Sequence, residues 1–149
     1  MDAITPEHVS DRKTSSPVKM AIRAATKYYE TRTGAVHALD NVSLDVREGE
    51  FLCILGPSGC GKTTLLWSMA GLHALSGGEI LLGSHPIVEP HPEIAMIFQD
   101  ANLLPWRNLL KNIELPFELK RKAPDCARIN RLLDRVGLSR EAAERYPHQ

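Results

Sequence analysis

The chain has 149 residues, enough for one domain with a hydrophobic core, and its 18 Lys and Arg balance its 18 Asp and Glu. This balance leaves no basic excess, so nucleic acid is not an expected partner. No apolar run approaches the roughly 18 residues of a membrane span. Residues 1–16 are polar and lack the apolar stretch of a signal peptide, so a disordered tail is expected there. The three cysteines lack C-x-x-C spacing, which favours a reducing compartment and disfavours a zinc site.

Three strands are predicted before residue 56. Apolar residues alternate with polar or small ones over residues 18–24 and over residues 42–46, which is typical of half-buried strands. A turn is expected at residues 31–34. Residues 51–55 are a short continuous apolar run, which predicts a buried strand. The pattern therefore indicates an antiparallel β layer followed by a β–α unit.

Residues 56–64 match the phosphate-binding pattern G-x-x-x-x-G-K-[ST] in full. The candidate ligand-binding residues are Gly56, Pro57, Ser58, Gly59, Cys60, Gly61, Lys62, Thr63 and Thr64. Glycines let the backbone approach phosphate oxygens, and the loop N–H groups form an anion site at the positive end of the next helix. Lys62 supplies a charge for the β- and γ-phosphates, and the Thr63 hydroxyl can ligate Mg²⁺.

A helix is predicted over residues 64–70, with Gly71 as its end. Leu-Ser-Gly-Gly at residues 75–78 predicts a tight turn into a short strand at residues 80–82. Residues 94–98 are a second continuous apolar run, which predicts a buried, parallel strand.

Three further helices are predicted in residues 100–149. Each begins at a residue whose side chain can cap a helix N-terminus: Asn108, Asp125 and Ser139. Pro116 is expected to interfere with the first helix, and the third is expected to run through Arg145. The second is expected to end at Gly137. It carries one apolar face with i, i+3, i+4, i+7 spacing: Ile129, Leu132, Leu133 and Val136.

Over residues 18–149 the chain resembles the ATP-binding subunit of an ABC transporter. The resemblance rests on Ala-Leu-Asp-Asn-Val-Ser-Leu at 38–44, Gly-Glu-Phe at 49–51, the phosphate-binding loop, and Phe-Gln at 98–99. Leu-Leu-Pro-Trp at 103–106, with Asn112 and Ile113, resembles the nitrate, sulfonate and taurine import branch. The implied fold is an α/β P-loop NTPase core with an N-terminal antiparallel β layer (17–99) and a partial helical subdomain (100–149).

The resemblance also implies residue roles, cofactors and partners. Tyr29, two residues after Lys27, matches the aromatic residue that stacks on adenine, with the neighbouring Tyr28 as the alternative. Gln99 matches the glutamine that reaches Mg²⁺ and the attacking water, and an amide can both donate and accept there. The implied cofactors are ATP and Mg²⁺. The implied partners are a transmembrane permease, a second nucleotide-binding subunit in a homodimer and, indirectly, a solute-binding protein, with the chain on the cytoplasmic face of the membrane.

Two segments imitate other motifs of this family. Leu-Ser-Gly-Gly at 75–78 spells the start of the family's signature, but it lies only 13 residues after Lys62, so a turn is predicted instead. Residues 94–100 are an apolar run that ends in Asp100. Because Gln99 intervenes and no Asp-Glu pair follows, this run is not interpreted as a Walker B strand.

Three functional hypotheses follow. The sequence ends at Gln149, where the resemblance implies that the family's signature would come next. An incomplete copy is therefore expected, without the signature, the Walker B aspartate or the catalytic glutamate. Such a copy is not expected to hydrolyse ATP alone. The first hypothesis is the ATP-binding component of an importer for nitrate, sulfonate, taurine or a similar small solute. The second is a nucleotide- or partner-binding remnant without turnover. The third is a nucleoside-monophosphate kinase, disfavoured because about 55 residues precede the loop.

Overall fold

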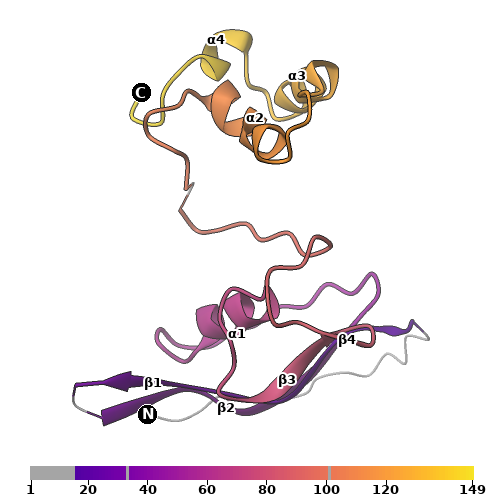
Figure 1. Ribbon diagram of the computed structural model, residues 1–149, viewed down its shortest axis with the longest axis vertical. Coiled ribbons are helices and arrows are strands. Elements are labelled where there is room, and N and C mark those ends of the chain that lie inside the picture. Colours follow the sequence, from indigo (N-terminus) through magenta and orange to yellow (C-terminus); the bar gives the residue numbers. More distant parts are fainter. Residues whose placement is uncertain (1–15, 33, 101) are drawn as a thin grey trace. The chain divides into compact units, whose positions relative to one another are not determined.

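The computed structural model describes residues 16–32, 34–100 and 102–149 (Figure 1). The chain divides into two compact units, Met1–Met96 and Ile97–Gln149. Apart from Ser16, the expected disordered tail lies outside the described residues, as does Thr33 of the expected turn. Among the described residues, no helix combines the length and the apolar character needed to cross a bilayer.

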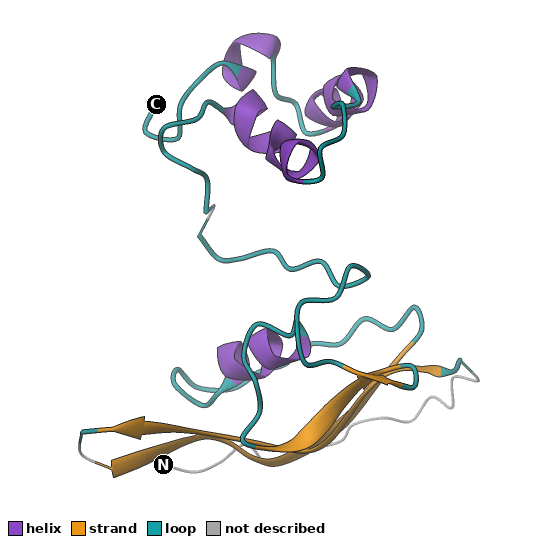
Figure 2. Cartoon of the chain, viewed as in Figure 1, coloured by secondary structure: helices purple, strands orange, loops and turns teal. Residues whose placement is uncertain are grey.

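The first unit is built on a four-stranded sheet with the order β2-β1-β3-β4. Figure 2 draws its strands in orange. The strands are β1 (Val18–Thr31), β2 (Gly34–Arg47), β3 (Gly77–Leu82) and β4 (His85–Pro86), and every neighbouring pair is antiparallel. The strands predicted at residues 18–24, 42–46 and 80–82 are confirmed, the first two as parts of strands of 14 residues each. The predicted antiparallel β layer is therefore present.

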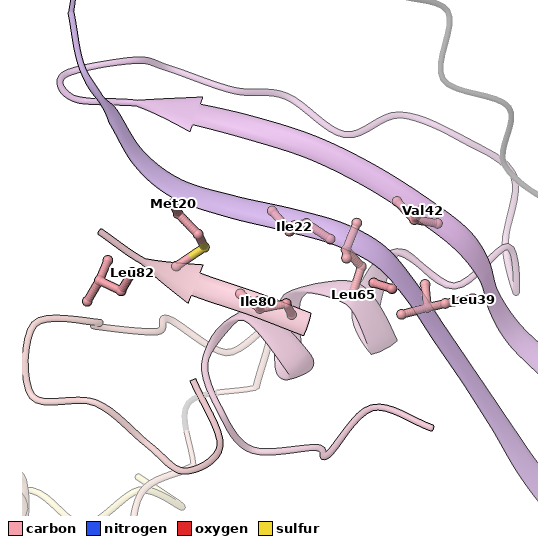
Figure 3. Close-up of a cluster of buried hydrophobic side chains, with 8 residues drawn as sticks. Met20, Ile22, Leu39, Val42, Leu65, Ile80 and Leu82 are labelled. Carbon is pink, nitrogen blue, oxygen red and sulfur yellow. The ribbon is translucent and has the colours of Figure 1, made fainter. Parts of the chain in front are cut away.

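The core of this unit lies between one face of the sheet and the helix α1 (Lys62–Met69), as Figure 3 shows. Its buried members are Met20, Ile22, Ala25, Leu39, Val42, Leu65, Ile80 and Leu82. Leu65 is the member that comes from α1, and it is 2% exposed. Full burial of such a side chain stabilises the fold by about 1.5–3 kcal/mol, so this contact fixes the helix on the sheet. The helix predicted at residues 64–70 is confirmed, with Ala70 as its C-cap.

Two predicted strands are wrong. Residues 51–55 and 94–98 form no strand, and the side chains of Phe51 and Ile97 are 94% and 98% exposed. A β-strand needs a neighbour that accepts and donates its backbone hydrogen bonds. Among the described residues no strand is hydrogen-bonded to either segment, so their apolar character alone does not produce one.

The Leu-Ser-Gly-Gly stretch at residues 75–78 leads into β3, as predicted. The Ser76 N–H donates to the Thr26 carbonyl at 2.8 Å, and Gly77 pairs with Thr26 in the ladder between β1 and β3. Hydrogen bonds to β1 therefore hold the backbone of this stretch within the sheet.

The second unit contains α2 (Leu109–Leu119), α3 (Cys126–Arg135) and α4 (Arg140–Ala143). All three predicted caps are confirmed. Asn108 accepts from the Lys111 N–H at 2.8 Å, Asp125 from Arg128 at 2.9 Å and Ser139 from Ala142 at 3.2 Å. Such a cap stabilises a helix by about 1 kcal/mol. The third helix ends at Ala143, before the predicted Arg145.

Pro116 does not end α2, which corrects the sequence-based expectation. Proline removes one backbone hydrogen bond, but Ile113 and Phe117 on either side of it pack against the buried cluster of Ile129, Leu133 and Ala143. That packing holds the helix together through the missing bond. The predicted apolar face of α3 is buried only in part, because Leu132 and Val136 are 48% and 69% exposed.

Candidate nucleotide-binding site

The predicted phosphate-binding loop runs directly into the N-terminus of α1. The Leu65 N–H donates to the Gly61 carbonyl at 2.9 Å, which closes the first turn of the helix. No side chain of the described residues caps this terminus. The first N–H groups of the helix therefore lie at the positive end of its dipole without a side-chain acceptor, which is the arrangement that binds anions.

Gly61 packs the loop against β2. Its φ is +96°, and a Cβ atom built on it would lie 2.1 Å from the carbonyl oxygen of Ala38. L-residues with a side chain avoid this φ, and the contact leaves no space for a methyl group. Only glycine fits at this position, so Gly61 allows the close approach of the loop to β2.

The Lys62 ammonium lies inside the loop. Its Nζ donates to the carbonyls of Gly56 at 2.8 Å and Pro57 at 2.7 Å, and it lies 3.5 Å from Cys60 Sγ. These contacts hold a half-buried positive charge over the loop that leads to the helix N-terminus. The charge and the N–H groups of the helix together suit a polyphosphate.

A cavity of about 510 Å³ opens beside this loop. Its lining comprises residues 57–64 and, from β2, residues 36–40 and 42. All the predicted loop residues except Gly56 therefore line one cavity. The β2 part of the lining is not predicted from the sequence: residues 38–44 carry part of the resemblance to the ABC family, but nothing in the pattern places them beside the loop.

The oxygen donors in this cavity fit a hard cation. The Thr63 and Thr64 side chains belong to the first turn of α1, and among the lining residues Asp40 carries an exposed carboxylate. Mg²⁺ prefers oxygen ligands and takes few of them from the protein. Gln99, the other predicted metal-binding residue, lies in an exposed loop of the second unit.

The two candidate base-stacking tyrosines have different surroundings. The half-buried Tyr29 lies opposite Val36, a lining residue of the cavity, and its hydroxyl is 2.9 Å from His73 Nδ1. Tyr28 is 44% exposed and its ring lies 6.0 Å from that of His37. Neither tyrosine is among the residues that line the cavity.

Comparison with known proteins agrees with this geometry. The profile of the family described as "ABC transporter" matches residues 39–149. An uncharacterized ABC transporter ATP-binding protein of Methanocaldococcus jannaschii is 41% identical over 89% of this chain and 50% of its own length. An aliphatic sulfonates import ATP-binding protein of Pectobacterium atrosepticum is 38% identical over 91% and 50%. A nitrate import ATP-binding protein of Synechococcus elongatus is 42% identical over 78% of this chain and 18% of its own length.

The fold is also found in solved structures. A dimeric ATP-binding cassette in a post-hydrolysis state, bound to ADP and Pi, superposes with a TM-score of 0.75 at 30% sequence identity, over 87% of this chain and 62% of that one. The chain spans half or less of the length of the curated relatives described above. The family match covers most of the chain, and the structural neighbours share the P-loop fold predicted from the sequence. The chain belongs to the ABC transporter family.

Proposed function

We propose that this chain forms the nucleotide-binding region of the ATP-binding component of an ABC importer. One observation carries the proposal: a complete phosphate-binding loop enters an uncapped helix N-terminus, with Lys62 Nζ held within the loop. The relatives named above are ATP-binding proteins, and the structural neighbour binds ADP and Pi, which supports the same ligand class here.

In the proposed complex the loop N–H groups and Lys62 bind the phosphates of ATP. Thr63 would hold Mg²⁺ through its hydroxyl, and the bound metal would neutralise part of the phosphate charge. Tyr29 is proposed to stack on the base. Gln99 is proposed to contact the metal and the attacking water; this role rests on its match to the family's glutamine.

The proposed partners are a transmembrane permease, a second copy of the nucleotide-binding subunit and, indirectly, a solute-binding protein, at the cytoplasmic face of the membrane. Residues 103–117 are the proposed permease contact, because Trp106 is 71% exposed and aromatic residues are enriched at interface cores. The relatives include nitrate import, bicarbonate transport, spermidine/putrescine import and aliphatic sulfonates import ATP-binding proteins. Because of residues 103–106, the proposed solute belongs to the nitrate, sulfonate and taurine group.

Titration of the chain with a fluorescent ATP analogue in the presence of Mg²⁺ tests ATP binding. Lys62→Ala removes a charge-assisted contact worth about 1.5–3 kcal/mol, which corresponds to an affinity lower by roughly one to two orders of magnitude. Lys122→Ala, an exposed lysine of the second unit, is the matched control and should leave the affinity unchanged. If Lys62→Ala folds and binds the analogue as tightly as the unmodified chain, the proposal is wrong.

A further inference from the structure

We propose that His73 is a positioning residue that orients the ring of Tyr29 for stacking on the nucleotide base. The proposal rests on the nucleotide-binding function proposed above and names a further residue that governs the same site. It starts from one contact between segments 44 residues apart in the sequence: the Tyr29 hydroxyl lies 2.9 Å from His73 Nδ1, and the contact is partly buried.

The end of α1 fixes the place of His73. The Gly71 N–H donates to the Ser68 carbonyl at 3.0 Å and the Leu72 N–H to the Trp67 carbonyl at 2.9 Å, which is a Schellman ending. Gly71 has a φ of +73°, and a Cβ atom there would lie 2.2 Å from the Glu89 carbonyl oxygen, so the position requires glycine. The chain consequently leaves the helix in one direction only.

The imidazole of His73 is held on a second side by the helix itself. Its ring meets the indole of Trp67 edge to face, with 4.7 Å between the ring centroids and 79° between the planes. Trp67 lies on α1, the helix that begins at the phosphate-binding loop. His73 therefore contacts both the helix that begins at the phosphate-binding loop and the aromatic ring of Tyr29 on β1.

Lys27 restrains the same ring from another direction. Its Nζ donates to the Ala74 carbonyl at 2.7 Å and lies 5.1 Å from the centroid of the Tyr29 ring. The hydroxyl of Tyr29 is thus held by His73 while one face lies against an ammonium group. A base would stack on the opposite face, and Tyr29 lies across the ladder from Val36, which lines the cavity.

The hydrogen bond affects base binding and not phosphate binding. An aromatic ring stacks well only in a narrow range of orientations, and a ring already held in that range loses less conformational entropy when the ligand binds. The bond between Tyr29 and His73 limits rotation of the tyrosine side chain before binding. Inorganic triphosphate has no base, so its affinity does not depend on the orientation of this ring.

Calorimetric titration of the full chain with Mg-ATP, and separately with Mg-bound inorganic triphosphate, tests the proposal. His73→Ala and Tyr29→Phe should each weaken ATP binding by about three- to tenfold, the effect of one hydrogen bond, and leave triphosphate affinity unchanged. His73→Asn should restore ATP affinity, because its amide lies near the place of Nδ1. His85→Ala, at an exposed histidine outside the cavity lining, is the matched control and should bind both ligands normally.

Each alternative result has a distinct meaning. If His73→Ala binds ATP normally, or loses ATP and triphosphate affinity to the same extent, His73 does not act through the base and the inference is overturned. Additive losses in the double variant of His73→Ala and Tyr29→Phe would also overturn it, because the two changes remove the same bond. If Lys62→Ala binds both ligands like the unmodified chain, the proposed function fails and this inference fails with it.

Discussion

Replacing Gly61 with alanine tests whether the contact between the phosphate-binding loop and β2 shapes the site. The new Cβ atom would lie 2.1 Å from the Ala38 carbonyl oxygen, whereas contacts below 3.0 Å do not occur in proteins, so the backbone must move by about 0.9 Å. The unfavourable φ of +96° costs about 1–2 kcal/mol. Relief of the overlap costs a further 1–3 kcal/mol or so, as overpacking does.

Gly59→Ala is the matched control for this prediction. Gly59 also has a positive φ, +81°, but nothing lies within 4 Å of its Cβ position, so this variant has the backbone strain without the overlap. Urea unfolding should show Gly61→Ala to be less stable than Gly59→Ala. Titration with a fluorescent ATP analogue should show a further loss of roughly tenfold or more, because misplacement by about 1 Å disrupts precise contacts. Equal stability and equal affinity of the two variants would refute the reasoning.

Three further predictions concern the stability of the two units. Asn112→Ala should lower the free energy of unfolding by about 1–3 kcal/mol, because the amide makes four hydrogen bonds to the backbone before α2; an unchanged urea midpoint would contradict this. Leu133→Ala, at a side chain that is 6% exposed, should cost about 2–5 kcal/mol, and Val136→Ala, at 69% exposed, far less; similar unfolding midpoints would count against the burial argument. The Lys19 ammonium, 2.9 Å from Glu93, holds the pKa of that carboxyl below its ordinary value. A carboxyl whose pKa is lowered on folding stabilises the fold at pH values above its unfolded-state pKa, and this stabilisation is lost as the pH falls through its folded-state pKa. The melting temperatures of Glu93→Gln and the unmodified chain should therefore converge in acid. A difference in melting temperature that persists at low pH, or that widens with salt, would argue against the ion pair.

The features that the sequence predicts well are those with local causes. Asn108, Asp125 and Ser139 cap helices because each side chain bonds to an N–H only three residues ahead. Residues 51–55 were wrongly predicted as a strand because a strand depends on a neighbour that the local pattern does not specify. The prediction that Pro116 interferes with α2 is wrong for a related reason. The packing of Ile113 and Phe117 against residues of later helices outweighs the local cost of the proline.

The same distinction between local and long-range causes applies to the candidate site. The phosphate-binding loop is contiguous, so the spacing of residues 56–64 alone predicts a loop that leads into a helix, and the phosphate-binding role of Lys62 stays a prediction. The β2 residues that line the cavity could not be predicted, because the pairing of β1 with β2 contains register shifts, one of them between Lys27 and Tyr28, that the local pattern does not specify. The contact between Tyr29 and His73 joins strand β1 to the segment that follows α1, and no short-range sequence pattern connects the two.

The exposure of residues 51–55 has a practical consequence for handling the protein. Phe51 and Leu55 are 94% and 81% exposed, and the backbone between them lies in no described sheet. A short apolar segment with unpaired N–H and C=O groups can pair with the same segment of another molecule. Solutions of the purified chain should therefore show light scattering that rises steeply with concentration. Phe51→Lys should reduce the scattering, since a charge in such a segment opposes association between chains.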